Sequence, residues 1–173
     1  MHVRDGREII EVTTYRGPHQ SESSVKSASK QSDKGLLLRD NVYGSLAEDA
    51  ARRDLTINAM YYDPIDESVL DEMGGNQDIE ARLVRILGDP QTRYREDPVR
   101  MLRAVRFAEK LDFEIEDLAE QKISELSHLM SHVAPARLFD EIIKLFVSGY
   151  GLQIFERLVE SGLFKAMFPV VEH

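Results

Sequence analysis

The spacing of apolar residues changes part-way along the chain, and this change constrains the fold more than any other feature. Before Asn76 the apolar residues occur in short alternating runs such as "HVRDGREIIEVTTYRG" (residues 2–17), a pattern typical of β-strands. Beyond Asn76 they recur at spacings of three and four, which is typical of amphipathic helices. The pattern predicts an α+β chain that is mainly α, with a boundary at about residues 75–88. Two helical stripes stand out: Met101, Ala104, Val105, Ala108 and Leu111 in one, and Leu138, Ile142, Leu145 and Phe146 in the other.

The first 35 residues divide into a predicted hairpin and a predicted loop. Asp5-Gly6 is a turn signal between two alternating runs, so residues 1–15 should form a β-hairpin. An isolated hairpin is marginally stable in water, which predicts that its strands belong to a larger sheet. The stretch from Gly17 to Gly35 is rich in serine and lysine and has too few apolar residues to offset the entropy of ordering, so a mobile surface loop is expected there.

Short elements are predicted between residues 45 and 75. Ser45 precedes Glu48 by three residues, the spacing of a capping box, which predicts a short helix. The runs "LTINAMYYD" (residues 55–63) and "SVLDEMGG" (residues 68–75) favour two short strands. Farther along, helices are expected at about residues 115–131 and 151–161.

Size and composition indicate an ordinary globular protein. A chain of 173 residues suits one domain or two small ones, and 42% hydrophobic with 31% charged residues is unlike a disordered chain. The absence of cysteine excludes disulfides and thiolate metal sites. No apolar run approaches the roughly 18 residues that a membrane span needs. We expect a soluble, cytoplasmic protein without a membrane partner.

Charge is unevenly distributed along the chain. A formal net charge of −9 argues against a chain that wraps nucleic acid by electrostatics alone, because non-specific binding depends on Lys and Arg neutralising phosphates. Any site for a nucleotide must therefore be local. The basic residues do cluster in two stretches: Arg52 and Arg53, then Arg93, Arg95, Arg100, Arg103 and Arg106.

The first basic stretch, "RRDLTINAM" (residues 52–60), joins two cations to a carboxylate. A nucleoside triphosphate site needs cations for the phosphates and carboxylates for Mg²⁺. Arg52, Arg53 and Asp54 can supply parts of both. The same three residues also suit solvated surface charge, because exposed ion pairs contribute little to stability.

The second basic stretch, "REDPVRMLRAVRF" (residues 95–107), places arginines on one side of a predicted helix that begins near Pro98. One interpretation is purely structural: Asp97 caps the helix, and Glu96 forms an i,i+4 surface pair with Arg100. Arg100, Arg103 and Arg106 are spaced three residues apart, so on a helix they lie on nearly the same side, each rotated slightly from the one before.

The functional interpretation of the same stretch is recognition of a base. The Asp97 carboxylate can accept from the exocyclic amine of adenine while the Arg100 guanidinium donates to its N1. Guanine and uracil present the opposite pattern, so the pair would reject both. Cytosine presents the same order as adenine, so the pair does not distinguish these two bases.

Both basic stretches, with their surroundings, resemble a known enzyme family. "EDAARRDLTINAMYYD" (residues 48–63) and "MGGNQDIEARLVRILGDPQTRYREDPVRMLRAVRFAEKL" (residues 73–111) are similar to the bacterial poly(A) polymerases and CCA-adding enzymes, which are class II nucleotidyltransferases. The family's Arg-Arg-Asp motif matches Arg52, Arg53 and Asp54, and its Glu-Asp-x-x-Arg motif matches Glu96, Asp97 and Arg100.

Residues 35–49 and 137–169 look like the poly(A) polymerase branch of this family. The resemblance implies that residues 1–75 are the C-terminal part of the nucleotidyltransferase palm, and that residues 76–173 are a helical neck and partial body that bind RNA and nucleotide. It implies template-independent transfer of AMP from ATP to RNA 3′ ends, with two Mg²⁺ ions that activate the attacking oxygen and stabilise the leaving pyrophosphate. The alternatives are a CCA-adding enzyme and a non-catalytic module that binds nucleotide or RNA.

The resemblance also implies roles for individual residues. Asp54 would serve the nucleotide or metal site, while Glu11, in "EIIEVTTYR" (residues 8–16), is the other candidate for the family's third catalytic carboxylate. Asp97 and Arg100 would recognise the base. The remaining nucleotide-binding residues would be Arg52 and Arg53 at the triphosphate, Arg103 and Arg106 in the pocket, and Asn58.

Two elements of the family pattern do not occur in this sequence: the Gly-Gly-x-x-Arg-Asp stretch and the Asp-x-Asp pair that holds the metals. The nearest substitute is Glu114 with Glu116, for which surface charge is the better interpretation. The chain is therefore expected to be an internal segment of the family pattern, without a complete metal site and inactive by itself. Its hairpin would expose a sheet edge that favours self-association or pairing with an N-terminal segment.

Overall fold

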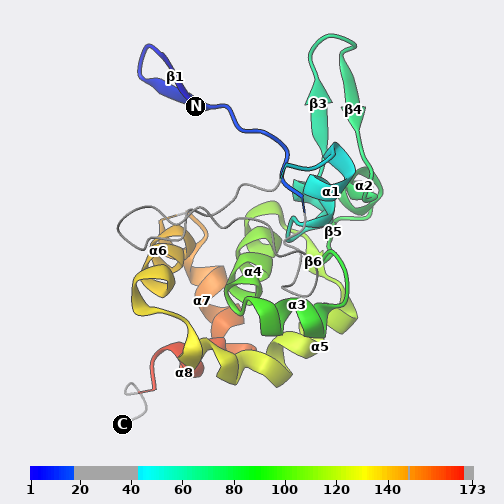
Figure 1. The fold of residues 1–173 in the computed structure, drawn as a ribbon. Coiled ribbons are helices and arrows are strands. Elements are labelled where there is room, and N and C mark those ends of the chain that lie inside the picture. The colour runs from blue at the N-terminus through cyan, green and yellow to red at the C-terminus, as the bar shows by residue number, and fades with distance from the viewer. Residues whose placement is uncertain (18–42, 148, 170–173) are drawn as a thin grey trace, which may run out of the picture. The chain divides into compact units, whose positions relative to one another are not determined.

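The computed structural model describes residues 1–17, 43–147 and 149–169 (Figure 1). The chain divides into two compact units, Met1–Arg52 and Arg53–His173. Apart from Gly17, the loop predicted at residues 17–35 lies outside the described residues. The predicted division into palm and neck at residues 75 and 76 stays a prediction.

The first unit begins with the predicted β-hairpin. β1 (His2–Asp5) pairs antiparallel with β2 (Glu8–Glu11), and Asp5 lies opposite Glu8. Gly6 takes a φ of +60° in the turn, a left-handed conformation that favours glycine. Both strands are exposed along their whole length, and among the described residues they pair only with each other. The larger sheet expected around the hairpin is therefore not present in this part of the chain.

The predicted capping box forms at the start of α1 (Leu46–Ala51). The Glu48 N–H donates to Ser45 Oγ at 3.3 Å, and the Ser45 N–H donates to a Glu48 carboxylate oxygen at 2.7 Å. These bonds satisfy backbone donors that the first turn of a helix leaves free. At the other end of α1, Arg52 is the C-cap and lies 3.5 Å from Asp49 in an ion pair.

The second unit begins differently from the sequence prediction. The strand expected at residues 55–63 is wrong in its first half, because Leu55 forms an isolated β-bridge and Thr56–Asn58 is a 3₁₀ helix, η1. Only β3 (Tyr61–Asp63) is a strand, and it pairs antiparallel with β4 (Ser68–Leu70).

A side-chain hydrogen bond explains why the strand does not continue through Thr56. Its Oγ1 donates at 2.6 Å to the buried carboxylate of Asp78, which lies 22 residues away. The Thr56 N–H donates to the Arg85 carbonyl at 3.1 Å, and the Ala59 N–H closes a turn back to the Thr56 carbonyl at 2.9 Å. These contacts fix the backbone in a turn that local alternation of side chains cannot reveal.

Beyond β4 the second unit is mainly helical, so the predicted fold class is confirmed. A short parallel pair, β5 (Leu83–Val84) with β6 (Glu114–Ile115), accompanies the helices. No helix in the described part of the chain is both long and apolar enough to cross a membrane. The helices are α2 (Gly75–Glu80), α3 (Pro90–Glu96), α4 (Val99–Leu111), α5 (Asp117–Leu126), the 3₁₀ helix η2 (Ser127–His132), α6 (Pro135–Phe146), α7 (Gly151–Glu160) and α8 (Leu163–Met167).

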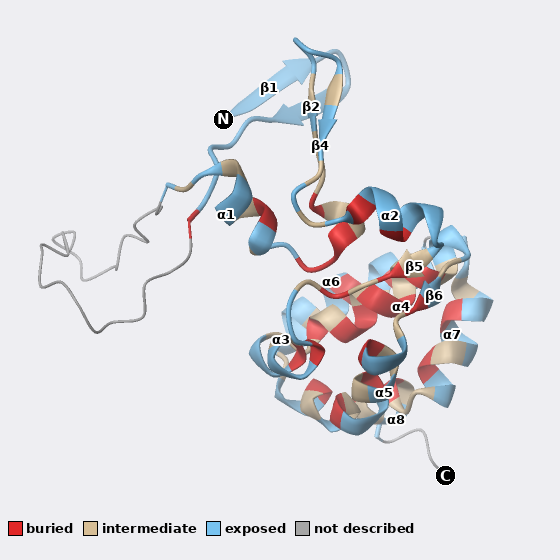
Figure 2. Ribbon diagram, turned by 90° about the vertical axis from the view of Figure 1, so that its right-hand side faces the viewer, coloured by how far each residue is buried: buried red, intermediate tan, exposed pale blue. Residues whose placement is uncertain are grey.

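Helix α4 contributes a continuous face to the hydrophobic core of the second unit (Figure 2). Met101, Ala104, Val105 and Ala108 of its predicted stripe are buried, whereas Leu111 at the end of the helix is 38% exposed. The helix packs against α6 and α7. Because the apolar face turns inward, the arginines that lie between its members are directed toward the edge of the core. The buried residues on α6 and α7 include Leu145, Ile154 and Leu158.

Arg157 of α7 joins three other elements through ion pairs. Its guanidinium lies 3.5 Å from Glu109 on α4, 2.6 Å from Glu120 on α5 and 3.9 Å from Glu114 on β6. The side chains of Arg157 and Glu109 are 21% and 19% exposed, so water and salt screen this pair less than they screen an exposed pair, whereas Glu120 and Glu114 are 47% and 83% exposed.

Candidate nucleotide-binding site

Asp54 is held at the start of the second unit by a neighbouring segment and by α4. The Leu87 N–H donates to the Asp54 carbonyl at 2.9 Å, and the Asp54 carboxylate oxygen Oδ1 accepts from the Leu55 N–H at 2.9 Å. The carboxylate is 7% exposed, and its Oδ2 lies 2.7 Å from Arg103 Nε. This contact is an ion pair without the alignment of a hydrogen bond. The structure thus brings together two predicted site residues, Asp54 and Arg103.

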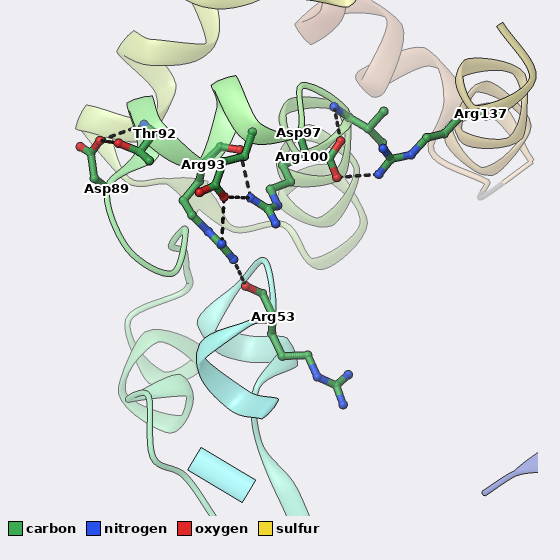
Figure 3. A network of polar contacts seen from close by, with 9 residues as sticks. Arg53, Asp89, Thr92, Arg93, Asp97, Arg100 and Arg137 are labelled. Atoms are coloured by element: carbon green, nitrogen blue, oxygen red, sulfur yellow. Dashed lines mark hydrogen bonds and ion pairs between the residues drawn. The ribbon is translucent and has the colours of Figure 1, made fainter. Parts of the chain in front are cut away.

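Arg93 of α3 links the two basic stretches of the sequence. Its Nη2 donates to the Arg53 carbonyl at 2.6 Å, and its Nη1 donates to the Glu96 carboxylate at 3.1 Å (Figure 3). Burial lowers the pKa of Arg93 and the charge of Arg100 lowers it further, while Glu96 opposes the shift. A guanidinium has so high an ordinary pKa that Arg93 stays protonated, and the site therefore holds a fixed positive charge.

Asp97 and Arg100 contact different partners in this conformation. Arg100 Nη1 donates to the Glu96 carboxylate at 3.0 Å. Asp97 Oδ2 accepts from Arg137 of α6 at 2.5 Å, and Asp97 Oδ1 accepts from the Val99 N–H at 3.3 Å (Figure 3). The Arg100 N–H donates to the Asp97 carbonyl at 3.1 Å, but within the described ranges no hydrogen bond joins their two side chains. This conformation therefore contains the structural alternative, in which Asp97 bonds at the start of the helix and Glu96 pairs with Arg100.

Arg93 and Arg137 have contacts that the sequence did not show. Each donates to a residue 40 positions away, Arg93 to Arg53 and Arg137 to Asp97. The sequence placed Arg93 in the basic cluster without a role and gave no role to Arg137. Hydrophobic period and motif spacing report on residues close in the chain, so neither contact had a local signal.

The other predicted residues of the second unit lie beside aromatic rings or at the end of η1. The Arg106 guanidinium is 4.7 Å from the centre of the Phe107 ring, and its Nε is buried without a hydrogen-bond partner among the residues described. The exposed Arg53 places its guanidinium 5.5 Å from the centre of the Tyr61 ring. Asn58 is half-buried as the last residue of η1. Cation–π contacts of this kind orient the guanidinium.

Two predicted site residues belong to the first unit. Glu11 is exposed at the end of β2, and Arg52 is the C-cap of α1. Their relation to Asp54 stays a prediction.

Positive charge exceeds negative charge in the contacts that surround Asp54. Arg93 joins Arg53 to Glu96, Glu96 also pairs with Arg100, and Arg103 pairs with Asp54. Four arginines are thus connected to two carboxylates in a chain whose formal net charge is −9. Guanidinium groups bind phosphate oxygens through parallel N–H donors, so this cluster suits a polyphosphate.

The residues that the structure describes do not fit a Mg²⁺ site. Among them, no group of three or more His, Asp or Glu side chains could hold a metal ion. Both carboxylate oxygens of Asp54 are engaged by the contacts given above. Glu114 lies near Arg157 and Glu116 pairs with Arg85, so these two acids serve ion pairs.

Two family models match most of the chain. One, described as "Poly A polymerase head domain", matches residues 1–85, and another, described as "Probable RNA and SrmB-binding site of polymerase A", matches residues 112–173. Poly(A) polymerase I of Haemophilus influenzae is 49% identical over 170 residues, which are 98% of this chain and 37% of that protein. The CCA-adding enzyme of Bacillus subtilis is 37% identical over 160 residues, which are 92% of this chain and 38% of that protein. The chain belongs to the nucleotidyltransferase family of poly(A) polymerases and CCA-adding enzymes.

The likeness to this nucleotidyltransferase family extends to three dimensions. A solved structure of a tRNA nucleotidyltransferase complexed with a primer tRNA and an incoming ATP analog has a TM-score of 0.68 and 31% identity, covering 75% of this chain and 38% of that one. The partial nucleotidyltransferase fold predicted from the sequence is confirmed. The family member described here spans a little over a third of the length of the curated relatives it matches.

Proposed function

We propose that this family member takes part in template-independent transfer of AMP from ATP to RNA 3′ ends. The observation that carries the proposal is the 49% identity to a poly(A) polymerase over 98% of the chain, a span that includes both the Arg-Arg-Asp and the Glu-Asp-x-x-Arg motifs. The arginine cluster around Asp54 supports it, because that cluster concentrates positive charge in an acidic protein.

In this proposal the arginine cluster binds the triphosphate of ATP. Arg53 and Arg106 each have a guanidinium that lies over an aromatic ring, and both would bind phosphate oxygens. Arg103 already pairs with Asp54, so a phosphate that binds the Arg103 guanidinium would compete with the Asp54 carboxylate. Arg52 and Asn58 would add further contacts to the nucleotide.

Recognition of adenine by Asp97 and Arg100 requires only a small exchange of partners. Arg100, whose side chain is 15% exposed, would leave the 52% exposed Glu96 and keep the bond from its Nη1 to the Arg93 carbonyl at 3.0 Å. Asp97 would keep Arg137 on Oδ2 and offer Oδ1, whose bond to Val99 is long at 3.3 Å. Arg137 then fixes the carboxylate while one of its oxygens turns to the base.

The chemical step is expected to need more than the described residues provide. Two Mg²⁺ ions would supply Lewis-acid stabilisation of the attacking and leaving oxygens, and the residues described do not fit them. We therefore propose that this chain by itself binds ATP through its arginines and adds no AMP to RNA.

Separate assays of ATP binding and of AMP addition to an RNA primer test this function. The expected result is ATP binding without primer extension. Addition of a polypeptide that contains the family's Asp-x-Asp strand should restore extension, and Asp54→Asn and Glu11→Gln then reveal which carboxylate is catalytic. Primer extension by the unaltered chain alone, or no binding of ATP, would refute the proposal.

A CCA-adding enzyme is the second candidate function. It is favoured by the 37% identity to a CCA-adding enzyme over 92% of the chain and by the fact that Asp97 and Arg100 suit cytosine as well as adenine. In the restored system, addition of CMP to a tRNA that lacks its 3′ end would favour this candidate. A module that binds nucleotide or RNA without catalysis is the third, and it predicts no restored extension.

The β1–β2 hairpin supports a further partnership in the first unit. Ile9 and Ile10 are 56% and 51% exposed, and the strands have free edges in the described residues. We expect pairing with an N-terminal segment or with a second copy, which sedimentation of the unaltered chain and of Ile10→Lys would compare.

A further inference from the structure

A surface pocket lies between the α3–α4 corner and the η2–α6 corner of the second unit. Its volume is about 420 Å³, within the range of roughly 300–1,000 Å³ that is common for ligand pockets. Four of its lining residues have apolar side chains: Pro98, Leu129, Val133 and Ala134. Glu96 and Asp97 line the pocket whereas Arg100 and Arg103 do not, so the pocket adjoins the arginine cluster around Asp54.

One arginine of the pocket lining, Arg95, has no charged partner among the described residues. Asp97 pairs with Arg137 across the pocket lining, and Glu96 pairs with arginines outside it (Figure 3). Arg95 is exposed and forms no hydrogen bond or ion pair with the residues that the structure describes. His132 also lines the pocket. An anionic group at the rim would therefore meet Arg95 as a free cation.

The pocket is lined by two segments of the chain, and only the second of them lies within the match to an RNA-binding site. Residues 95–98 belong to the second basic stretch, in which Asp97 and Arg100 recognise the base in the proposed function. Residues 129–137 fall within the match to an RNA-binding site at residues 112–173. An occupant of the pocket contacts both segments at once. A nucleotide has the required parts, since a base has flat apolar faces and a phosphate is anionic.

We propose that this pocket binds one nucleotide of a single-stranded RNA, with its base against the apolar walls and its phosphate at Arg95. The proposal rests on the proposed function, because it places RNA on the Arg137 side of Asp97 and ATP on the Arg100 side. RNA is favoured over free nucleotide because the η2–α6 wall lies within the match to an RNA-binding site. Asp97 would then stand between the growing RNA end and the incoming base.

A pair of alanine substitutions tests whether the pocket is occupied. Ala134 and Ala136 are both exposed and nearly adjacent, but only Ala134 lines the pocket. In the full chain, Ala134→Trp should weaken binding of a fluorescent oligo(A) RNA about tenfold, the loss expected when one stacked base is expelled. Ala136→Trp should leave it unchanged. Circular dichroism of both variants shows whether the fold is kept.

Arg95→Ala provides an independent test that does not depend on added bulk. It should reduce the slope of log affinity against log salt for oligo(A) by about 0.7, the contribution of one phosphate contact on a single strand. Arg82→Ala, a change at an exposed arginine outside the pocket, should not change the slope. This comparison decides the matter if Ala134→Trp does not fold.

ATP binding measured in the same variants separates the two proposals. Unchanged ATP affinity with weakened oligo(A) supports the RNA pocket. Equal oligo(A) affinity in Ala134→Trp and Ala136→Trp, together with an unchanged salt slope in Arg95→Ala, overturns it and leaves the proposed function intact. Loss of ATP affinity in Ala134→Trp, with or without loss of RNA, also overturns it, because the pocket would then hold free nucleotide. If the unaltered chain binds no ATP, the proposed function fails whatever the RNA assay shows.

Discussion

Replacement of Arg103 by methionine should destabilise the protein more than replacement of its partner Asp54 by asparagine. Asp54 is 7% exposed and the Arg103 side chain 37%, so Arg103→Met leaves a carboxylate away from water, whereas Asp54→Asn leaves a guanidinium that water reaches. Loss of one partner of a fully buried pair costs roughly 3–5 kcal/mol. The exposure of Arg103 reduces the expected cost of Arg103→Met to about 1–3 kcal/mol, against about 1 kcal/mol or less for Asp54→Asn.

Urea unfolding followed by circular dichroism measures these free energies of unfolding. The matched control is Arg82→Met, because Arg82 pairs with Asp112 while both side chains are mostly exposed, at 60% and 93%. Its expected cost is below about 1 kcal/mol. The double variant Asp54→Asn/Arg103→Met should be more stable than Arg103→Met alone, since it leaves no buried charge without a partner. Equal costs for Arg103→Met and Arg82→Met would show that burial of Asp54 does not matter.

Two further predictions concern base recognition and pH. Arg100→Ala should weaken ATP binding, measured by calorimetric titration, by roughly 1–3 kcal/mol, the usual range for a bidentate base contact. Equal affinity of the unaltered chain for ATP and GTP would contradict the role of Asp97 and Arg100. Bonds from the Thr92 hydroxyl and N–H lower the pKa of Asp89, the N-cap of α3. Its contribution to stability should therefore be complete above the usual carboxyl pKa and be lost as pH falls through the lower pKa of the folded state. In thermal unfolding from about pH 6 to pH 2, Asp89→Ala should show a weaker dependence on pH than the unaltered chain, and an identical dependence would count against the cap.

Local signals predicted those elements whose stabilising contacts lie within a few residues. The capping box of Ser45 and Glu48 and the turn at Gly6 are of this kind, and both are present in the structure. The apolar stripe of α4 was also visible, because a helix buries positions three and four apart. Thr56 shows the limit: its alternating neighbours suggested a strand, but its hydroxyl bonds to Asp78, 22 residues away.

In the candidate site, too, some contacts were predictable from the sequence and others were not. The motif match selected Asp54 and Arg103 from distant parts of the sequence, and the structure pairs them. Spacing also allowed the pair of Glu96 with Arg100, which is present at 3.0 Å. The contact of Arg137 with Asp97 could not be predicted, because it depends on how α6 packs beside the start of α4. Tertiary packing, which no local pattern encodes, therefore decides which oxygen of the Asp97 carboxylate Arg137 binds.

The three ion pairs of Arg157 have a consequence for how the second unit opens. One guanidinium serves acids on α4, α5 and β6, so local unfolding of α7 would leave all three acids without their shared cation. Amide hydrogens of α4, α5 and α7 should therefore exchange with solvent as one cooperative group, while the exposed β3–β4 hairpin exchanges separately. In that case a nucleotide bound beside α4 would also slow hydrogen exchange in α7, and a ligand that stabilises α7 would protect α4 in return.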